Sequence, residues 1–240
     1  MSDSPPPMDT GYVEPSVGRI SVRTAAVLLA FTLVFTALMA GTYKLTEPLV
    51  MESARVEKLR LIGEVLPIDA YDNNLLADSV LIPAQSELDT REDTLLFRAR
   101  KGSVPVASVI EAAAPDGYSG RIELLLAVSA EGQLLALRVT GHKETPGLGD
   151  YIDPKKDRNK QRPWITQFNR IGFEAVPEDR WRVKKDGGYF DQMNGATISA
   201  RAVTNASRRA MAWIIPRQAA LFSLPAGARF EAEVNGGKSP

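Results

Sequence analysis

The 240-residue sequence contains no cysteine and a single histidine, His142. Without thiols the chain holds no disulfide, no thiolate zinc site, no cysteine-ligated iron–sulfur cluster and no cysteine nucleophile. One histidine without a carboxylate–histidine pattern argues against a metal enzyme, and it fits a surface residue as well as a proton donor. Redox chemistry on this chain would therefore require a bound cofactor.

The sequence also lacks a net charge and the common nucleotide motifs. Its 29 basic and 29 acidic residues balance, so no global field favours nucleic acid or an acidic substrate. Neither Gly-x-Gly-x-x-Gly, nor a Walker A sequence, nor Gly-x-Ser-x-Gly occurs. These absences leave nicotinamide binding, nucleotide hydrolysis and serine-hydrolase chemistry without support.

An uncharged run over residues 24–43, rich in Leu, Val, Ala and Phe, stands near the N-terminus. As a helix it would cover about 30 Å, the thickness of the hydrocarbon layer of a bilayer. The apolar region of a cleavable signal peptide is shorter. We therefore expect a retained transmembrane helix over residues 20–44, in contact with lipid, after a polar N-terminal tail over residues 1–19.

The segment after this run carries a second helical pattern. Apolar residues recur at helical spacing between Val56 and Leu66, and Pro67 ends the pattern. A polar stretch follows. We expect residues 45–93 to form a membrane-proximal helix and a connecting region.

Runs rich in β-branched and apolar residues then predict strands. The predicted strands span residues 94–99, 104–112, 121–130 and 133–140. The last two are joined by a hairpin turn at Glu131-Gly132. Strands followed by helical patterns predict an α+β domain, an antiparallel sheet with flanking helices. We assign residues 94–222 to this domain and residues 223–240, rich in small and charged residues, to a flexible tail.

The stretch over residues 191–201 combines a turn with the start of a helix. Asn194-Gly195 is a strong turn signal, and the residues after it carry apolar side chains at helical spacing. Thr197 or Ser199 then lies at or just inside the helix N-terminus, where free N–H groups and the helix dipole favour a phosphate. The same residues are also typical of an ordinary helix with a hydroxyl N-cap.

A second loop, Gly141–Asp150, directly follows the last predicted strand. Pro146-Gly147 and Gly149 favour a turn whose exposed amides can reach a flat ligand. The residues by themselves fit an ordinary surface loop equally well.

Both loops resemble motifs of the FMN-binding subunits of bacterial respiratory complexes. Asp191-x-x-Asn194-Gly195-Ala196-Thr197 is similar to their flavinylation motif, usually Asp-x-x-Ser/Thr-Gly-Ala-Thr, with Asn194 where the family usually has Ser or Thr. Glu144-Thr145-Pro146-Gly147-Leu148-Gly149 is similar to a second signature of that family, which lines the flavin pocket.

The residues between the motifs narrow this resemblance. Tyr151-Ile152-Asp153, Trp164-Ile165 and Phe168 resemble the RnfG family, the FMN-binding G subunits of the Rnf electron-transport complex. They match less well the homologous C subunits of the sodium-translocating NADH:quinone reductase. The resemblance covers the chain from the apolar run to about residue 220.

The resemblance implies a covalent flavin. In the family a flavin transferase esterifies a threonine hydroxyl to the FMN phosphate, which makes Thr197 the acceptor in preference to Ser199. Leu148 is implied to pack on the face of the isoalloxazine ring. The implied cofactor-binding residues are Thr197, Glu144, Thr145, Leu148, Gly195, Ala196 and Ser199. No catalytic residue and no metal ligand is expected.

Other side chains near the motifs have two interpretations. Lys143 and Arg201 either neutralise the flavin phosphate or are ordinary solvated charges. Four aromatic residues either wall the flavin ring or belong to the core. They are Trp164, Trp181, Tyr189 and Phe190.

The resemblance also implies a function. It implies a single-pass subunit of the bacterial inner membrane, with the flavin domain on the periplasmic side, although the Lys and Arg counts beside the apolar run favour the opposite orientation. The protein would relay electrons through FMN in an ion-translocating ferredoxin:NAD oxidoreductase, with the other subunits as partners and no turnover alone. Alternatives are the C subunit of the sodium-translocating enzyme, a membrane-anchored assembly or binding module without flavin, and a soluble flavin enzyme, which the apolar run disfavours.

Overall fold

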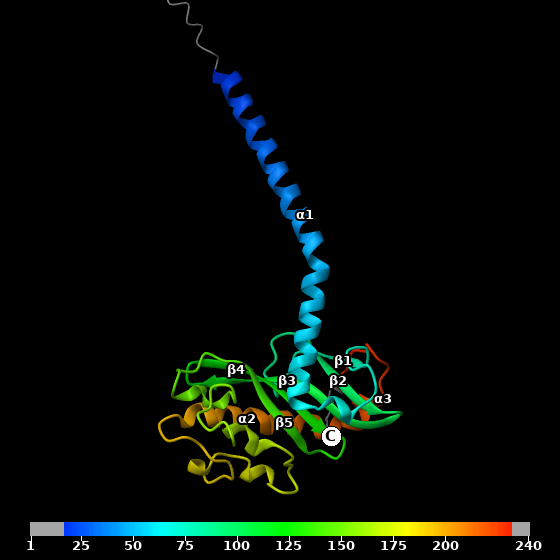
Figure 1. Ribbon diagram of the computed structural model, residues 1–240, viewed down its shortest axis with the longest axis vertical. Helices are drawn as coiled ribbons and strands as arrows, with labels where there is room; N and C mark the ends of the chain where they lie inside the picture. Colours follow the sequence, from blue (N-terminus) through cyan, green and yellow to red (C-terminus); the bar gives the residue numbers. More distant parts are fainter. Residues whose placement is uncertain (1–16, 232–240) are drawn as a thin grey trace, which may run out of the picture. The chain divides into compact units, whose positions relative to one another are not determined.

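The computed structural model describes residues 17–231 (Figure 1). The chain divides into two compact units, residues 1–56 and 57–240. In the first unit the structure describes a single element, the N-terminal part of helix α1 (Val17–Val65). The second unit contains the sheet and the remaining helices. The expected N-terminal tail lies outside the described residues except for its last positions, which are helical.

Helix α1 contains the expected transmembrane segment. Its stretch Ile20–Glu47 is long and apolar enough to cross a membrane, and its side chains are exposed throughout. The hydroxyls of Thr32 and Thr42 donate to the carbonyls of Leu28 and Leu38 (2.9 and 2.8 Å), which satisfies these polar groups within the helix. These features fit a membrane anchor.

The two helices expected on either side of residue 45 are one helix. Helix α1 continues without a break to Val65. The charged segment between Glu52 and Glu64 is rich in residues with high helix propensity, so nothing in it ends the helix before Pro67.

Five antiparallel strands form one sheet in the order β1-β2-β3-β4-β5. They are β1 (Ser79–Ile82), β2 (Thr94–Lys101), β3 (Val104–Gly117), β4 (Gly120–Ser129) and β5 (Leu134–Gly141). The four predicted strands are β2 to β5, and the predicted hairpin turn between β4 and β5 is closed by a bond from the Gly132 amide to the Ser129 carbonyl (3.0 Å). The α+β prediction is confirmed.

Two strand features differ from the prediction. Strand β1 was not predicted, because four residues between polar loops give little periodicity; it is defined by its pairing with β2. Strand β3 runs on to Gly117, past an alanine run and Pro115 that have low strand propensity. Pairs such as Ala113–Glu123 hold this extension against β4. Because β1 belongs to the sheet, the sheet domain begins before residue 94, the expected start.

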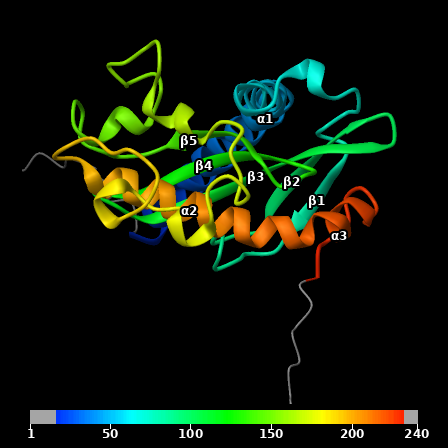
Figure 2. The same cartoon turned by 90° about the horizontal axis from the view of Figure 1, so that it is seen from below.

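Apolar side chains cover both faces of the sheet. On one face Ile62 and Val65 of α1 pack with Phe97 and Val109. On the other face lies helix α2 (Thr197–Ile214), which runs across the sheet mainly over β3 (Figure 2). Neighbouring residues of one strand alternate between the two clusters, as the pleat requires.

The remaining elements are short. Five 3-10 turns frame the sheet and α2, and a further turn leads into helix α3 (Gln218–Ser223). The turns are η1 (Ile68–Ala70), η2 (Gly149–Ile152), η3 (Trp164–Phe168), η4 (Glu178–Arg180), η5 (Lys184–Asp186) and η6 (Ile215–Arg217).

The beginning of the expected flexible tail is ordered. The amides of Gly227 and Phe230 donate to the carbonyls of Ser79 and Leu81 (2.7 and 2.8 Å). Phe230 is buried against Trp213. This aromatic contact and the backbone pairing fix residues 225–231, so the tail does not start at 223; residues 232–240 lie outside the described part.

A buried arginine joins the sheet to the C-terminal segment. Arg98 is 1% exposed, and it donates to Leu221 and Leu224 carbonyls (2.9 and 2.6 Å) and through Nε to Asp78 Oδ1 (2.7 Å). Asp78 also accepts from Nε of Arg100 (2.8 Å). The single carboxylate therefore balances a guanidinium that has lost nearly all its water.

Asp78→Ala is expected to lower the free energy of unfolding by about 3 kcal/mol, because it leaves the buried Arg98 charge without a counterion. Asp93→Ala is the matched control, since Asp93 pairs with the half-exposed Arg229; its expected cost is below about 1 kcal/mol. Urea unfolding of the full chain in detergent measures both. Equal costs for the two variants would contradict the assigned role of Asp78.

Candidate cofactor site

Helix α2 begins at Thr197, as the turn and the helical spacing predicted. Its N-cap residue is Ala196, and no side chain caps the helix with a hydrogen bond. Thr197 is the first helical residue and not the N-cap, so its hydroxyl does not cap the helix. The first amides of an uncapped helix, at the positive end of its dipole, can bind an anion.

A buried contact joins the two sequence motifs. The Ser199 hydroxyl, in the first turn of α2, donates to Oε2 of Glu144. Oε1 of Glu144 accepts from the backbone amide of Ser119 in the β3–β4 hairpin (3.0 Å). Glu144 and Ser199 are 3% and 1% exposed. One carboxylate thus ties together the hairpin, the loop after β5 and the start of α2.

Two glycines make room for this carboxylate. A Cβ at Gly149 would lie 2.6 Å from both Oε2 of Glu144 and the hydroxyl oxygen of Ser199. A Cβ at Gly117 would lie 2.3 Å from the Gly120 carbonyl oxygen and 2.8 Å from Oε1 of Glu144. These distances are shorter than contacts that real side chains adopt. Glycine is therefore required at these positions for steric reasons.

A cavity of about 130 Å³ lies where these segments meet. It is lined by Tyr118, Glu144, Thr145, Leu148, Gly149, Gly195, Ala196, Ile198 and Ser199. Three apolar side chains remain accessible beside it: Tyr118 is 68% exposed, Leu148 53% and Ile198 43%. The structure therefore brings the two predicted motifs to one apolar-rimmed cavity.

Tyr151 holds the turn that precedes α2. Its buried hydroxyl donates to the Ala196 carbonyl and accepts from the Met193 amide, both at 3.2 Å. The Ala196 amide in turn donates to the Met193 carbonyl (3.1 Å). Burial raises the pKa of Tyr151 to about 12, so the phenol remains a donor at physiological pH.

Other residues considered in the sequence lie outside the cavity. Arg201 pairs with Asp186 (2.8 Å between Nη2 and Oδ1), and this hydrogen bond raises the pKa of the guanidinium. Lys143 is exposed, and the His142 ring accepts from the Glu144 amide (3.1 Å). None of the three side chains lines the cavity.

The aromatic residues form a cluster beside the motif. Trp181 and Phe190 are fully buried, and both pack on Phe168. Trp164 is half-buried, and its ring nitrogen donates to the Asp191 carbonyl (2.6 Å). Tyr189 is 52% exposed. Of the four rings only that of Trp164 bonds to the motif, and none of them lines the cavity.

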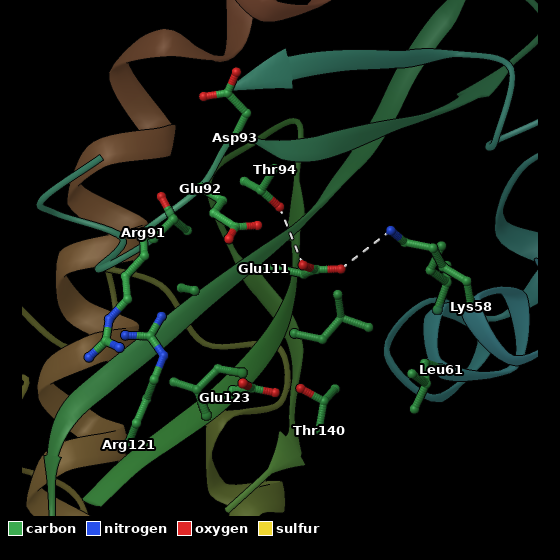
Figure 3. Close-up of a pocket in the computed structure, with 15 residues that line it drawn as sticks. Lys58, Leu61, Arg91, Glu92, Asp93, Thr94, Glu111, Arg121, Glu123 and Thr140 are labelled. Carbon is green, nitrogen blue, oxygen red and sulfur yellow. Dashed lines mark hydrogen bonds and ion pairs between the residues drawn. The ribbon is translucent and has the colours of Figure 1, made fainter. Parts of the chain in front are cut away.

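A larger cavity, about 630 Å³, lies on the opposite face of the sheet, beside the end of α1 (Figure 3). There Glu111 accepts from the Thr94 hydroxyl (3.3 Å) and pairs with Lys58 (3.5 Å). Its charged lining residues carry both signs: Lys58, Arg91, Glu92, Asp93, Glu111, Arg121 and Glu123. This mixture favours no one ligand charge, and no motif residue lines this cavity, so of these two cavities the one lined by both motifs is the better candidate.

Comparison with known proteins gives two family matches. The FMN-binding domain family matches residues 117–212, and the family described as the RnfG N-terminal region matches residues 14–65. Proteins named as the G subunit of the ion-translocating oxidoreductase complex are similar over most of their length. The one from Shewanella amazonensis is 37% identical over 206 residues, 86% of this chain and 94% of the relative. The one from Cronobacter sakazakii is 42% identical over 202 residues, 84% of this chain and 92% of the relative. The one from Escherichia coli K12 is 41% identical over 207 residues, 86% of this chain and 97% of the relative.

The chain belongs to the RnfG family, the G subunits of ion-translocating oxidoreductase complexes. Membership confirms the predicted family and its FMN-binding domain. The matched domain begins at Gly117 and ends in α2, so it includes the β3–β4 turn, both motifs and the residues that line the cavity.

The residues at the start of α2 and around the cavity fit FMN. The uncapped start of α2 suits a phosphate, and the apolar side chains of Leu148 and Ile198 suit a flat ring. The cavity is smaller than a pocket that encloses a whole ligand, typically about 300 Å³ or more. The residues that line it could therefore enclose only part of FMN.

Tyr118, Gly149 and Ile198 line the cavity and Tyr151 holds the turn before α2, yet none of the four was predicted from the sequence as a cofactor-binding residue. Tyr118 reaches the cavity from the β3–β4 hairpin, where it stands between Gly117 and Gly120. Tyr151 was noted in a family-like segment, without its bonds to the turn. Flanking glycines are a usable signal for Tyr118, whereas a contact across 45 residues leaves no local signal for Tyr151.

Tyr151→Phe should lower the free energy of unfolding by about 1–3 kcal/mol, because it leaves the Met193 amide and the Ala196 carbonyl without their partner. Hydrogen exchange at Met193 should also become faster. Tyr189→Phe is the matched control: the side chain of Tyr189 is half-exposed and its expected change is below about 0.5 kcal/mol. Unchanged exchange in Tyr151→Phe would show that the turn does not depend on the phenol.

Proposed function

We propose that this chain is the membrane-anchored flavoprotein subunit of an ion-translocating ferredoxin:NAD oxidoreductase, and that it relays electrons through FMN esterified to Thr197. The observation that carries the proposal is the cavity at the uncapped start of α2, lined by residues of both motifs. FMN, when bound, supplies one- and two-electron redox chemistry. The chain's own residues bind and orient it.

The attachment point follows from the positions of the two hydroxyls in the first turn of α2. Ser199 is 1% exposed and donates to Glu144, so its hydroxyl is already engaged. Thr197 is partly exposed and makes no capping bond. A phosphodiester on Thr197 would keep one negative charge at the positive end of the helix dipole. A flavin transferase would make the bond.

The half-open cavity supports a relay role. Glu144 and Ser199 close its floor, and Leu148 and Ile198 present apolar surface at its mouth. A ring held on this surface would keep an edge accessible to a redox group on another subunit, while no constellation of acid and base residues lines the cavity for turnover of a small substrate. The chain alone would then catalyse no net reaction.

The proposal also covers the location of the protein. The apolar stretch Ile20–Glu47 would span the bacterial inner membrane once, in contact with lipid, with the flavin domain on the periplasmic side. Partners would be the other subunits of the complex. The match to the RnfG N-terminal region favours this complex over the sodium-translocating quinone reductase, and co-purified subunits would distinguish the two.

Thr197→Val should abolish covalent flavin while leaving the fold intact, because valine keeps the shape of threonine but lacks the linking oxygen. The measurement is fluorescence of the membrane-expressed band on a denaturing gel, together with intact mass, in cells that contain the transferase. Wild type should fluoresce at its own mass and carry one FMN.

Ser199→Ala is the matched control for the acceptor. It removes the other hydroxyl of the same helical turn and should retain the FMN mass. If the Thr197→Val protein still carries flavin after denaturation, the acceptor is a residue other than Thr197. A colourless wild type, with the transferase active, would favour a membrane-anchored assembly module without flavin.

Leu148→Ala should leave the covalent mass unchanged but make the flavin more accessible to solvent, because it removes apolar surface from the mouth of the cavity. Quenching of flavin fluorescence by iodide should rise, and the flavin midpoint potential should shift. Val104→Ala is the control, since Val104 is also exposed but does not line the cavity. Identical quenching in both variants would show that Leu148 does not shield the flavin ring.

A further inference from the structure

We propose that Asn194 is a site of spontaneous deamidation, and that its products block attachment of FMN to Thr197. The modification itself depends only on the chemistry of the turn. The consequence for FMN rests on the proposed function.

The turn exposes the two reacting groups. Asn194 and Gly195 are the central residues of a turn closed by the bond from the Ala196 amide to the Met193 carbonyl. Gly195 has φ +86°, the positive value that the third position of a type II turn requires. Both central residues are exposed, and a Cβ at Gly195 would meet nothing within 4 Å.

No competing interaction restrains these groups. Within residues 17–231 the Asn194 side chain makes no hydrogen bond, and the Gly195 amide finds no backbone or side-chain acceptor. By contrast, the side chain of Asn73 bonds to the Arg98 carbonyl (2.9 Å), and that of Asn159 accepts from the Arg162 amide (3.0 Å).

The following residue also distinguishes Asn194. It is the one asparagine in the described part of the chain that precedes a glycine; Asn235-Gly236 lies outside that part. Because glycine has no Cβ, its amide nitrogen approaches the preceding side chain without steric hindrance.

The reaction is balanced without an oxidant or a reductant. The backbone nitrogen of Gly195, having lost its proton to water, attacks Cγ of Asn194. A C–N bond forms, and the side-chain nitrogen leaves as ammonia, which produces a five-membered succinimide. Water then opens the ring at either carbonyl, giving aspartate or isoaspartate at position 194.

Both products change the surroundings of the Thr197 hydroxyl, the proposed acceptor of FMN. Aspartate adds a negative charge just before the helix start that would hold the FMN phosphate, and like charges repel. Isoaspartate lengthens the main chain by one carbon between positions 194 and 195. The longer chain cannot keep both the Met193–Ala196 turn and the two bonds from Tyr151. Thr197 then loses its fixed position.

The test for the modification uses the full chain in detergent, produced without the transferase and aged at mildly alkaline pH. Trypsin cleaves after Lys185 and Arg201, so one peptide contains both Asn194 and Thr197 and no other asparagine. Its mass and chromatographic separation report aspartate and isoaspartate. An unaged sample, digested in parallel, sets the background.

The reference rate comes from the same protein unfolded in urea. We expect the folded chain to deamidate at Asn194 within about tenfold of the unfolded rate, which means protection below about 1.4 kcal/mol. A folded rate far below that range would overturn the proposal, because the turn would then protect the asparagine.

The test for the consequence adds transferase and its flavin substrate to fresh and aged protein. FMN on the tryptic peptide should fall in proportion to the deamidated fraction. Asn194→Ser, which cannot form the succinimide, should label equally before and after ageing. Deamidated peptide that carries FMN as often as intact peptide would overturn the consequence. If fresh wild type carries no FMN, the proposed function fails, while the peptide map still decides the modification.

Discussion

The hydrogen bond between the buried Ser199 hydroxyl and the Glu144 carboxylate is the contact on which the site depends. It joins the loop that follows β5 to the first turn of α2, between residues 55 positions apart in the sequence. A carboxylate removed from water must be well bonded, and Glu144 receives one bond from the helix and one from the hairpin. Because both bonds are needed, three separate segments take fixed positions around one cavity.

The sheet and α2 could be predicted from local patterns. Runs such as residues 121–130 are long and apolar, and Glu131-Gly132 closes its hairpin through a turn with its own signature. Strand β1 could not be predicted in this way, since its pairing with β2 and not its composition defines it. The extension of β3 through an alanine run likewise depends on β4.

The sequence predicted those parts of the candidate site in which a residue type determines the local backbone conformation. Gly195 takes the positive φ that the Asn-Gly signal requires, and Thr197 begins the helix that the spacing required. The need for glycine at 117 and 149 could not be read in the sequence, because it arises from close approaches that form only in the fold. These are the Gly120 carbonyl and Glu144 at Gly117, and Glu144 and Ser199 at Gly149. The phenol of Tyr151 acts on a turn 42 residues away, and no pattern encodes such a contact.

The two edges of the sheet have a further consequence. An exposed edge strand offers free amides and carbonyls to any other extended chain. Here the segment around Arg229 bridges to Leu81 of β1, and Ile171 bridges to Leu134 of β5, so protein backbone covers part of each edge. A loop that looks like a simple connection, and a C-terminal segment that looks dispensable, thereby limit self-association of the domain through strand pairing. For a protein that must assemble with specific partners, keeping these edges covered preserves its other surfaces for those partners.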